Sequence, residues 1–260
     1  MKLLLMGCLH GSAPKTIIEA VKIYSPDAIL CCGDLCNADD LRDLEFGVWQ
    51  KPSVIKALFD DAAHRNMIKR SADSMQIPIK FLSSLRVPVL LVYGNNDFLD
   101  ADLKKMRINS RGLESRLPKN IRLLKDEVFK IGDAYVAGFP GYRSSLEKLG
   151  GGQRVEKRIS RILSKIKDPE STIFLTHDVP YKKFDLVTWE KSPAYGRHVG
   201  EKSFNAMLRK TRFLAFVCAH MHEHQGSDKL FGTLIINTGY GKAGRAVLLD
   251  TKSMKTRMIR

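Results

Sequence analysis

The chain has 260 residues and a formal net charge of +15 at neutral pH, with 44% hydrophobic and 27% charged residues. This balance is that of an ordinary soluble globular protein, and the length fits one α/β unit with a single large core. No run approaches the roughly 18 apolar residues of a membrane span, which excludes a transmembrane protein. The basic excess favours a phosphate-bearing partner, including a nucleotide or nucleic acid, although a solvated basic surface fits the same composition.

The opening residues MKLLLMGCLHG are compatible with three roles for Cys8, which are a lipid-modified cysteine, a core thiol and a metal ligand. A lipoprotein signal needs an apolar core of about 7–15 residues, and only residues 3–6 are available. The chain has five cysteines, an odd number, and several of them lie in apolar runs. We therefore expect a cytoplasmic protein with reduced thiols and no membrane partner.

The first half of the chain alternates short apolar runs with amphipathic segments. The runs predict strands over residues 2–6, 28–32 and 89–93, and a helix is expected over 15–24. The long polar segment 38–86 is mostly helical in pattern, so we predict a helical insertion there. Its apolar residues would serve core packing or a dimer contact, and they are Val48, Trp49, Ile55, Leu58 and Phe59.

The second half changes character. Closely spaced runs at 121–124, 128–131 and 135–139 predict strands joined by short turns, and this spacing favours antiparallel pairing. Further segments are predicted as helices over about 153–167 and 201–210, and as strands over 172–176, 213–218, 233–237 and 245–250. Because neither repeats nor a linker are apparent, residues 1–260 are expected to form a single α/β domain with two sheets.

Polar side chains follow five of the predicted strands at their carboxyl ends. They are Cys8 and His10, then Asp34, then Asn95, Asn96 and Asp97, then His177, and finally His220 and His222. Ligands bind at that edge in open α/β sheets. Each residue alone also has an ordinary structural explanation, as a helix cap, a turn residue or a satisfied core histidine. Together, nitrogen and oxygen donors from several strands indicate a site for two first-row divalent metals.

The order of these motifs resembles the calcineurin-like metallophosphoesterases, whose motifs run D-x-H, G-D, G-N-H-D/E, H and G-H-x-H. The matching segments are Cys8-x-His10, Gly33-Asp34, Gly94-Asn95-Asn96-Asp97, His177 and Ala219-His220-x-His222. The segments 176–180 and 237–239 are also similar to the family's flanking patterns. The resemblance covers about residues 3–250 and implies a four-layer α/β/β/α sandwich of two mixed sheets.

The resemblance also implies a ligand set for two divalent transition-metal ions, which would be Mn, Fe, Zn or Ni. One ion would be held by Cys8, His10 and His222, and the other by Asn95, His177 and His220, with Asp34 bridging both. Asn96 and Asp97 would be the catalytic residues. Two such cations lower the pKa of a shared water, and the resulting hydroxide would attack a phosphate ester.

Two positions depart from the family pattern. Cys8 stands where the family has an aspartate; a thiolate ligand would favour zinc or iron, whereas a thiol that does not bind would leave that position weakly occupied. Asn96 stands where the family has a histidine that assists the leaving group, and an amide cannot transfer a proton. By analogy with family branches that carry a cysteine there, we expect a phosphodiesterase rather than a monoesterase. The alternatives are a catalytically degenerate binding or scaffold protein on the same fold, and a hydrolase that keeps a single metal.

Overall fold

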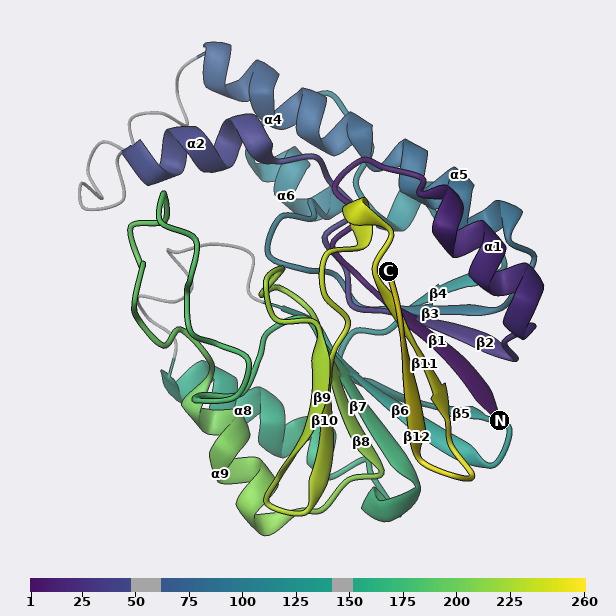
Figure 1. Cartoon of the computed structure of the whole chain (residues 1–260). Helices are drawn as coiled ribbons and strands as arrows, with labels where there is room; N and C mark the ends of the chain where they lie inside the picture. The colour runs from purple at the N-terminus through teal and green to yellow at the C-terminus, as the bar shows by residue number, and fades with distance from the viewer. Residues whose placement is uncertain (48–61, 142–151) are drawn as a thin grey trace.

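The computed structural model describes residues 1–47, 62–141 and 152–260. They form two six-stranded sheets that lie face to face, with helices on both outer faces (Figure 1). The predicted α/β sandwich of two mixed sheets flanked by helices is confirmed. The apolar residues between Val48 and Phe59 that we assigned to packing or a dimer contact lie outside the described residues.

The first sheet has the strand order β12-β11-β1-β2-β3-β4. Its strands are β1 (Lys2–Met6), β2 (Ala28–Cys31), β3 (Val89–Leu91), β4 (Ile121–Leu123), β11 (Ala246–Asp250) and β12 (Lys255–Ile259). The four strands β1 to β4 are parallel neighbours, and β11 and β12 extend the sheet through antiparallel pairs. The carboxyl ends of β1, β2 and β3 therefore lie together at one edge.

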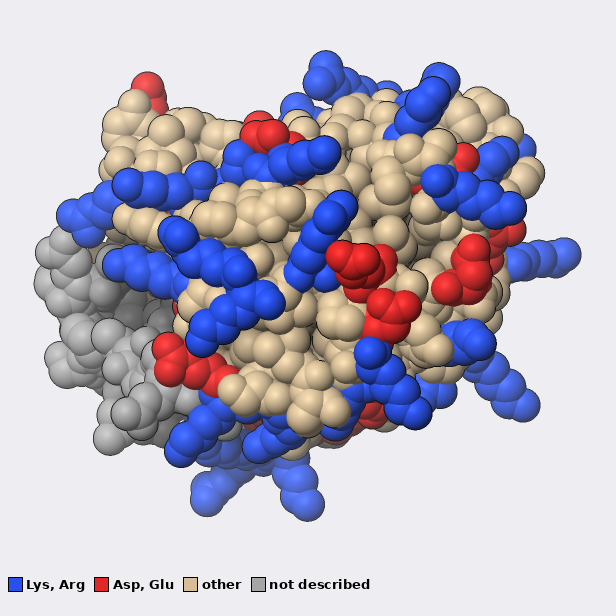
Figure 2. All heavy atoms as spheres, turned by 90° about the horizontal axis from the view of Figure 1, so that it is seen from below, with Lys and Arg blue, Asp and Glu red and all other residues tan. Residues whose placement is uncertain are grey.

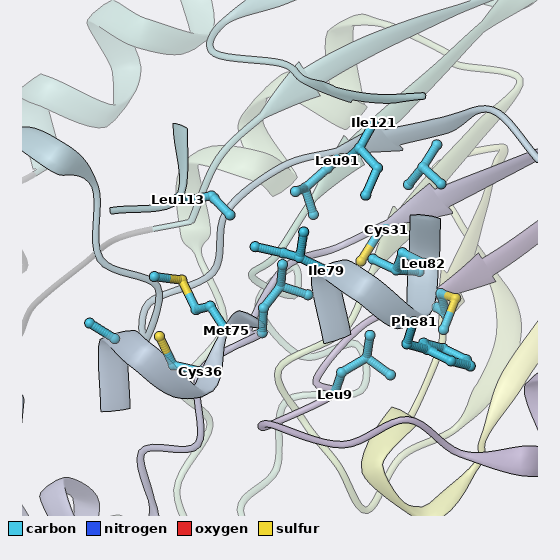
Figure 3. Close-up of a cluster of buried hydrophobic side chains, with 14 of the residues drawn as sticks. Leu9, Cys31, Cys36, Met75, Ile79, Phe81, Leu82, Leu91, Leu113 and Ile121 are labelled. Atoms are coloured by element: carbon cyan, nitrogen blue, oxygen red, sulfur yellow. The ribbon is translucent and has the colours of Figure 1, made fainter. Parts of the chain in front are cut away.

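Helices cover the outer face of this sheet. They are α1 (Lys15–Tyr24), α2 (Asp39–Gly47), α4 (Ala62–Ser74), α5 (Gln76–Ser84) and α6 (Asp100–Lys105). The described parts of the segment predicted as a helical insertion thus form α2, α4 and α5. Figure 3 shows Ile79 and Leu82 of α5 beside Cys31 of β2 and Leu91 of β3, all within one buried cluster. This packing fixes the outer helices to the strands that carry the first motifs.

The second sheet has the order β5-β6-β7-β8-β10-β9. Its strands are β5 (Glu127–Ile131), β6 (Ala134–Phe139), β7 (Thr172–Thr176), β8 (Ala215–Cys218), β9 (Gly226–Leu230) and β10 (Thr233–Asn237). The helices α8 (Gly152–Leu163) and α9 (Lys202–Lys210) cover its outer face. Between helices and sheet lies a cluster of phenylalanines, in which the rings of Phe174 and Phe216 stack with centroids 5.4 Å apart. Such ring pairs stabilise beyond their buried area.

Strand β1 shows why the central strands are hydrophobic on both faces. Leu4 and Met6 pack in the cluster beneath the helices, whereas Leu3 and Leu5 pack in the cluster between the two sheets. Successive side chains of a strand point to opposite faces, so a strand covered on both sides must be apolar throughout. The polar residues can therefore begin only where the strand ends, and there they gather.

The pairing of one predicted strand was wrong. We expected the strand at 121–124 to pair antiparallel with its successors, but β4 pairs in parallel with β3, with Ile121 opposite Val89. The antiparallel hairpin begins only with β5 and β6. A short connection between two strands is compatible with a hairpin and equally with a step from one sheet to the other. Strands β9 and β12 were missed, because both are partly exposed and carry mixed polar residues.

The described helices include none that combines the length and the apolar composition needed to cross a bilayer.

Candidate metal centre

The backbone at the carboxyl ends of the strands adopts a rare conformation at four predicted ligands. The φ angles of Cys8, His10, Asp34 and His220 are 53°, 42°, 57° and 62°. This left-handed region costs a non-glycine residue on the order of 1–3 kcal/mol and is concentrated at functional sites. Backbone hydrogen bonds hold two of these turns: Cys8 N–H donates to the Gly33 carbonyl at 2.8 Å and His10 N–H to that of Asp34 at 3.0 Å.

A first group of donors joins the end of β1 to the loop after β8. His10 Nε2 lies 3.1 Å from His222 Nε2, and His10 Nδ1–H donates to the Cys36 carbonyl oxygen at 3.1 Å. A carbonyl can only accept, so the neutral ring of His10 carries its proton on Nδ1 and presents the Nε2 lone pair to the site. Burial lowers the pKa of both His10 and His222, which keeps the rings neutral.

A second group joins β3, β7 and β8. His177 Nδ1–H donates to the Cys32 carbonyl oxygen at 2.8 Å, which leaves the Nε2 lone pair facing the site. That Nε2 lies 2.9 Å from Asn95 Oδ1 and 3.1 Å from His220 Nδ1. Histidines that bind metals commonly donate their other ring N–H to a backbone carbonyl in this way.

The Asp34 carboxylate lies between the two groups. Its Oδ2 is 3.7 Å from His10 Nε2 and 3.4 Å from His177 Nε2. Asn96 donates to the same carboxylate twice, from its backbone N–H to Oδ1 at 2.9 Å and from Nδ2 to Oδ2 at 2.7 Å. Burial raises the pKa of Asp34, but His177, His10 and the Asn96 N–H outweigh it and lower the pKa to about 2. The group is an anion at neutral pH.

The Cys8 sulfur lies close to ligand atoms of both donor groups. Its Sγ forms one cluster with His10 and His222 and another with Asp34 and His177, and within each cluster the ligand atoms lie within 4.8 Å of one another. The thiol is fully buried. Burial, and next the Asp34 carboxylate, raise its pKa well above the usual range, so a bound cation is what would turn the thiol into a thiolate.

The donor set fits divalent metal ions. Lone pairs of the His10 and His177 rings, the Asn95 amide oxygen and the Asp34 carboxylate converge on one buried space. Such convergence of acceptors is unfavourable unless a cation or a proton stands between them. Imidazole, carboxylate and thiolate are the ligands that zinc, iron and related ions take in proteins.

Asp97 was predicted as a catalytic residue, and the structure places its carboxylate beneath the site rather than among the converging donors. Its Oδ2 accepts hydrogen bonds from the backbone N–H of Asp34 at 2.8 Å and of Gly94 at 2.9 Å. Its Oδ1 accepts from the N–H of Leu35 at 2.7 Å and of Cys36 at 3.2 Å. Burial and the nearby Asp34 raise its pKa to about 6. Asp97 is therefore a positioning residue that ties the ends of β2 and β3 together.

A glycine makes room for this arrangement. A Cβ at Gly94 would overlap the Oδ1 atom of Asp34 and the Nδ1 atom of His177. Gly33, with a φ of +85°, is blocked in the same way by the backbone at Gly94. The glycine of each motif thus lets the strand ends approach closely enough for their side chains to meet.

Three further residues hold the loop that carries His220 and His222. Asn237 Nδ2 donates to the Met221 carbonyl at 3.0 Å, which gives a structural role to the segment 237–239. Arg245 Nη1 donates to the His222 carbonyl at 3.2 Å, and the Tyr240 ring stacks on that of His222 with centroids 4.2 Å apart. Tyr240 and Arg245 were missed, because no spacing in the sequence relates them to the histidine motif.

The comparisons with known proteins identify the family of the chain and its fold. The family model of the calcineurin-like phosphoesterases matches residues 1–224, so the chain belongs to that family and is a metal-dependent phosphoesterase by class. One solved crystal structure has a TM-score of 0.71 at 16% identity, covering 99% of this chain and 97% of its own. The protein TT1561 of Thermus thermophilus has a TM-score of 0.59 at 16% identity, covering 100% and 99%.

A further structure, described as a novel archaeal phosphodiesterase, has a TM-score of 0.44 at 15% identity and covers 100% of this chain and 99% of its own. A search of curated protein sequences finds no significant match. At these identities the solved structures show the fold, and the family model carries the classification.

The substitution Asp97→Asn tests the positioning role. An amide cannot accept from all four backbone donors, and each buried donor left unsatisfied costs roughly 1–3 kcal/mol. We expect the free energy of unfolding to fall by about 2–4 kcal/mol and metal binding to weaken, measured by urea unfolding and by elemental analysis. The exposed turn variant Asp133→Asn should change neither, and an unaltered stability of Asp97→Asn would contradict the assignment.

The acid stability of the metal-free protein follows from His222. Burial, followed by His10, lowers its pKa from 6.5 to about 3. Between these values the unfolded chain takes up a proton on His222 and the folded chain does not, so unfolding becomes more favourable as the pH falls. We expect this residue to remove up to about 1.4 kcal/mol of stability per pH unit below its ordinary pKa.

Urea unfolding of the chelated protein at several pH values measures this slope. His222→Gln should flatten it, whereas His224→Gln, whose ring hydrogen bonds to the Leu186 carbonyl, should leave it as in the wild type. An equal slope in both variants would exclude His222 as the source.

Proposed function

We propose that this protein is a phosphodiesterase with two divalent metal ions. The observation that carries the proposal is the convergence of two donor groups on either side of one carboxylate, with Asp34 Oδ2 at 3.7 Å and 3.4 Å from the ring nitrogens of His10 and His177. Cys8, His10 and His222 would hold one ion. Asn95, His177 and His220 would hold the other, with Asp34 between them.

When bound, the two ions would supply an activated water and neutralise the charge of the phosphoryl oxygens. The chain's own residues orient the ligand side chains and hold them in place. The carbonyl oxygens of Cys36 and Cys32 fix the proton of His10 and of His177 on Nδ1, so that both Nε2 atoms face inward. Asp97 fixes the turn that presents Asp34, and this rigidity pre-organises the donors.

Asn96 supports diesters over monoesters. Its Nδ2 lies 2.7 Å from Asp34 Oδ2, at the edge of the donor space, where the amide could donate a hydrogen bond to a phosphoryl oxygen. It cannot protonate a leaving oxygen, and the loss of a general acid costs on the order of 10²–10⁴ in rate, most for poor leaving groups. Together with the analogy to family branches without this histidine, that favours a diester substrate with a leaving group that departs unaided.

The alternative of a degenerate scaffold is less well supported. A protein without catalysis has no need to keep four histidines and a carboxylate with their donor atoms facing one another, or four turns in a strained conformation. Both features lower stability unless a bound ion offsets them. Metal loading followed by an assay of phosphate-ester hydrolysis therefore separates the two functions.

The basic surface supports a nucleotide or oligonucleotide as the substrate. On the face shown in Figure 2, Lys and Arg side chains are spread over most of the visible surface, with smaller acidic patches between them. Lys157, Arg161 and Lys210 of α8 and α9 form no ion pair with any other residue in the described part of the chain. Free cations of this kind attract the backbone of a nucleic acid.

Activity after chelation and reloading tests the reaction. We expect the chelated protein to be inactive, and reloading with Mn²⁺, Zn²⁺, Ni²⁺ or Fe²⁺ to restore hydrolysis of an aryl phosphodiester at least tenfold faster than that of the matching monoester. Asn96→His, which supplies the missing acid, should raise the monoester rate by roughly 10²-fold or more. Asn109→His, at an exposed position, is a control with the same change of side chain and should have no effect.

A clear preference of the wild type for the monoester would overturn the diester assignment. Metal uptake without any hydrolysis of a panel of phosphate esters would favour the scaffold.

Salt dependence tests the nucleic acid substrate. Binding of a fluorescent single-stranded oligonucleotide to the metal-free protein should weaken at least tenfold between about 50 and 200 mM salt, because counterions are released on binding. The variant Arg161→Glu/Lys210→Glu should weaken binding and flatten the salt slope. Lys15→Glu/Lys22→Glu on α1, with the same change in net charge, should bind as the wild type. Equal losses in both variants would show attraction by net charge alone.

A further inference from the structure

We propose that the Cys8 thiolate is shared by both metal positions, so that the centre is bridged by sulfur as well as by Asp34 and selects thiophilic ions such as zinc, iron(II) or cobalt(II). The inference rests on the proposed function, from which it takes the two positions. It differs from the sequence-based expectation, in which Cys8 served only the ion held by His10 and His222.

The position of the sulfur carries the inference. Cys8 Sγ is within 4.8 Å of the donor nitrogens of His10 and His222, and equally within 4.8 Å of the Asp34 oxygen and the His177 nitrogen. Donors on one tetrahedral ion, at bond lengths of about 2.0–2.3 Å, lie roughly 3.4–3.8 Å apart. The upper limit of 4.8 Å exceeds these separations by at most about 1.4 Å, so a small shift would bring the sulfur into the coordination sphere of an ion in either group.

The backbone leaves the side chain of Cys8 little freedom to turn away. Cys8 N–H donates to the Gly33 carbonyl at 2.8 Å, and the Cys8 carbonyl accepts from the Lys242 N–H at 2.9 Å. The residue is held in the left-handed conformation with a φ of 53° and is completely buried. Its Cα is thus held in place, and its side chain is buried in the cluster between the two sheets, next to both donor groups.

The chemistry of sulfur suits a shared position. A thiolate offers several lone pairs on one large atom, so a single sulfur can bind two ions at once. It is a soft ligand that zinc and iron accept and that magnesium and manganese disfavour. The remaining four cysteines are also buried, but none of them joins a cluster of potential metal ligands within the described residues. Cys8 alone therefore supplies sulfur to the centre.

Cobalt(II) titration of the full-length, chelated protein tests the proposal, because a cobalt–thiolate bond gives a charge-transfer band in the near ultraviolet. We expect the band to grow over two equivalents of cobalt. Cys8→Ser should lack the band and bind both equivalents at least tenfold more weakly, by calorimetry. Cys218→Ser removes a buried thiol that donates to the Ile236 carbonyl, and it should titrate as the wild type.

The variant Cys8→Asp shows whether a loss of metal binding in Cys8→Ser results from the missing sulfur or from misfolding. It should again bind two ions, without the band, and its affinity for Mn²⁺ relative to Zn²⁺ should rise at least tenfold. A wild-type band that saturates at one equivalent, or a Cys8→Ser variant that loses only one ion, would overturn sharing while leaving the metal centre intact. If the wild type bound no cobalt, zinc or manganese, the two-metal function and this inference would fall together.

Discussion

The hydrogen bonds of the Asp97 carboxylate are the interaction on which the rest of the site depends. Its two oxygens accept from the backbone N–H of Asp34, Leu35, Cys36 and Gly94. These bonds join the turn after β2 to the turn after β3 and hold Asp34 in a conformation that an aspartate rarely adopts. The backbone carbonyls that orient His10 and His177 belong to the same connected segment, at Cys36 and Cys32. One buried anion therefore sets the geometry of several ligands that it does not touch.

The arrangement of the ligand side chains lowers the stability of the folded, metal-free protein. Lone pairs of neutral imidazoles that face one another in a buried space are destabilising in the absence of a cation. Acid makes the imbalance worse, because the unfolded chain can protonate histidines whose pKa the fold lowers. A divalent ion would offset both effects at once, so that metal binding and folding stability should be linked in this protein.

The two departures from the family pattern have different consequences. As a ligand, Cys8 would change which ions the centre prefers, since sulfur would replace a carboxylate oxygen at a position close to both donor groups. Asn96 would change which leaving groups the site can expel, since an amide can donate a hydrogen bond but cannot transfer a proton. In the proposed function, the centre would therefore rely on its ions and on the substrate's own leaving group, rather than on a protonated side chain.

The sequence by itself determined which segments form the ligand-carrying strands of the two sheets. It also showed a potential ligand residue at the end of each of these strands. Strands covered on both faces must be apolar throughout, so the change to Cys8, Asp34 or His177 at a strand end is visible in the chain. It did not determine the edge strands β9 and β12, whose residues are mixed in polarity, or the parallel partner of β4, because a short connection fits either sheet.

Only the tertiary structure decided how the donors meet. The sequence placed Asp97 next to Asn96, but its role as a support for the backbone follows from atoms on two different strands. The stacking of Tyr240 on His222 and the position of the Cys8 sulfur between both groups likewise depend on contacts between residues far apart in the chain. The local sequence pattern predicts which residues lie at the end of a strand. The distances between those residues are set by the packing of one sheet on the other.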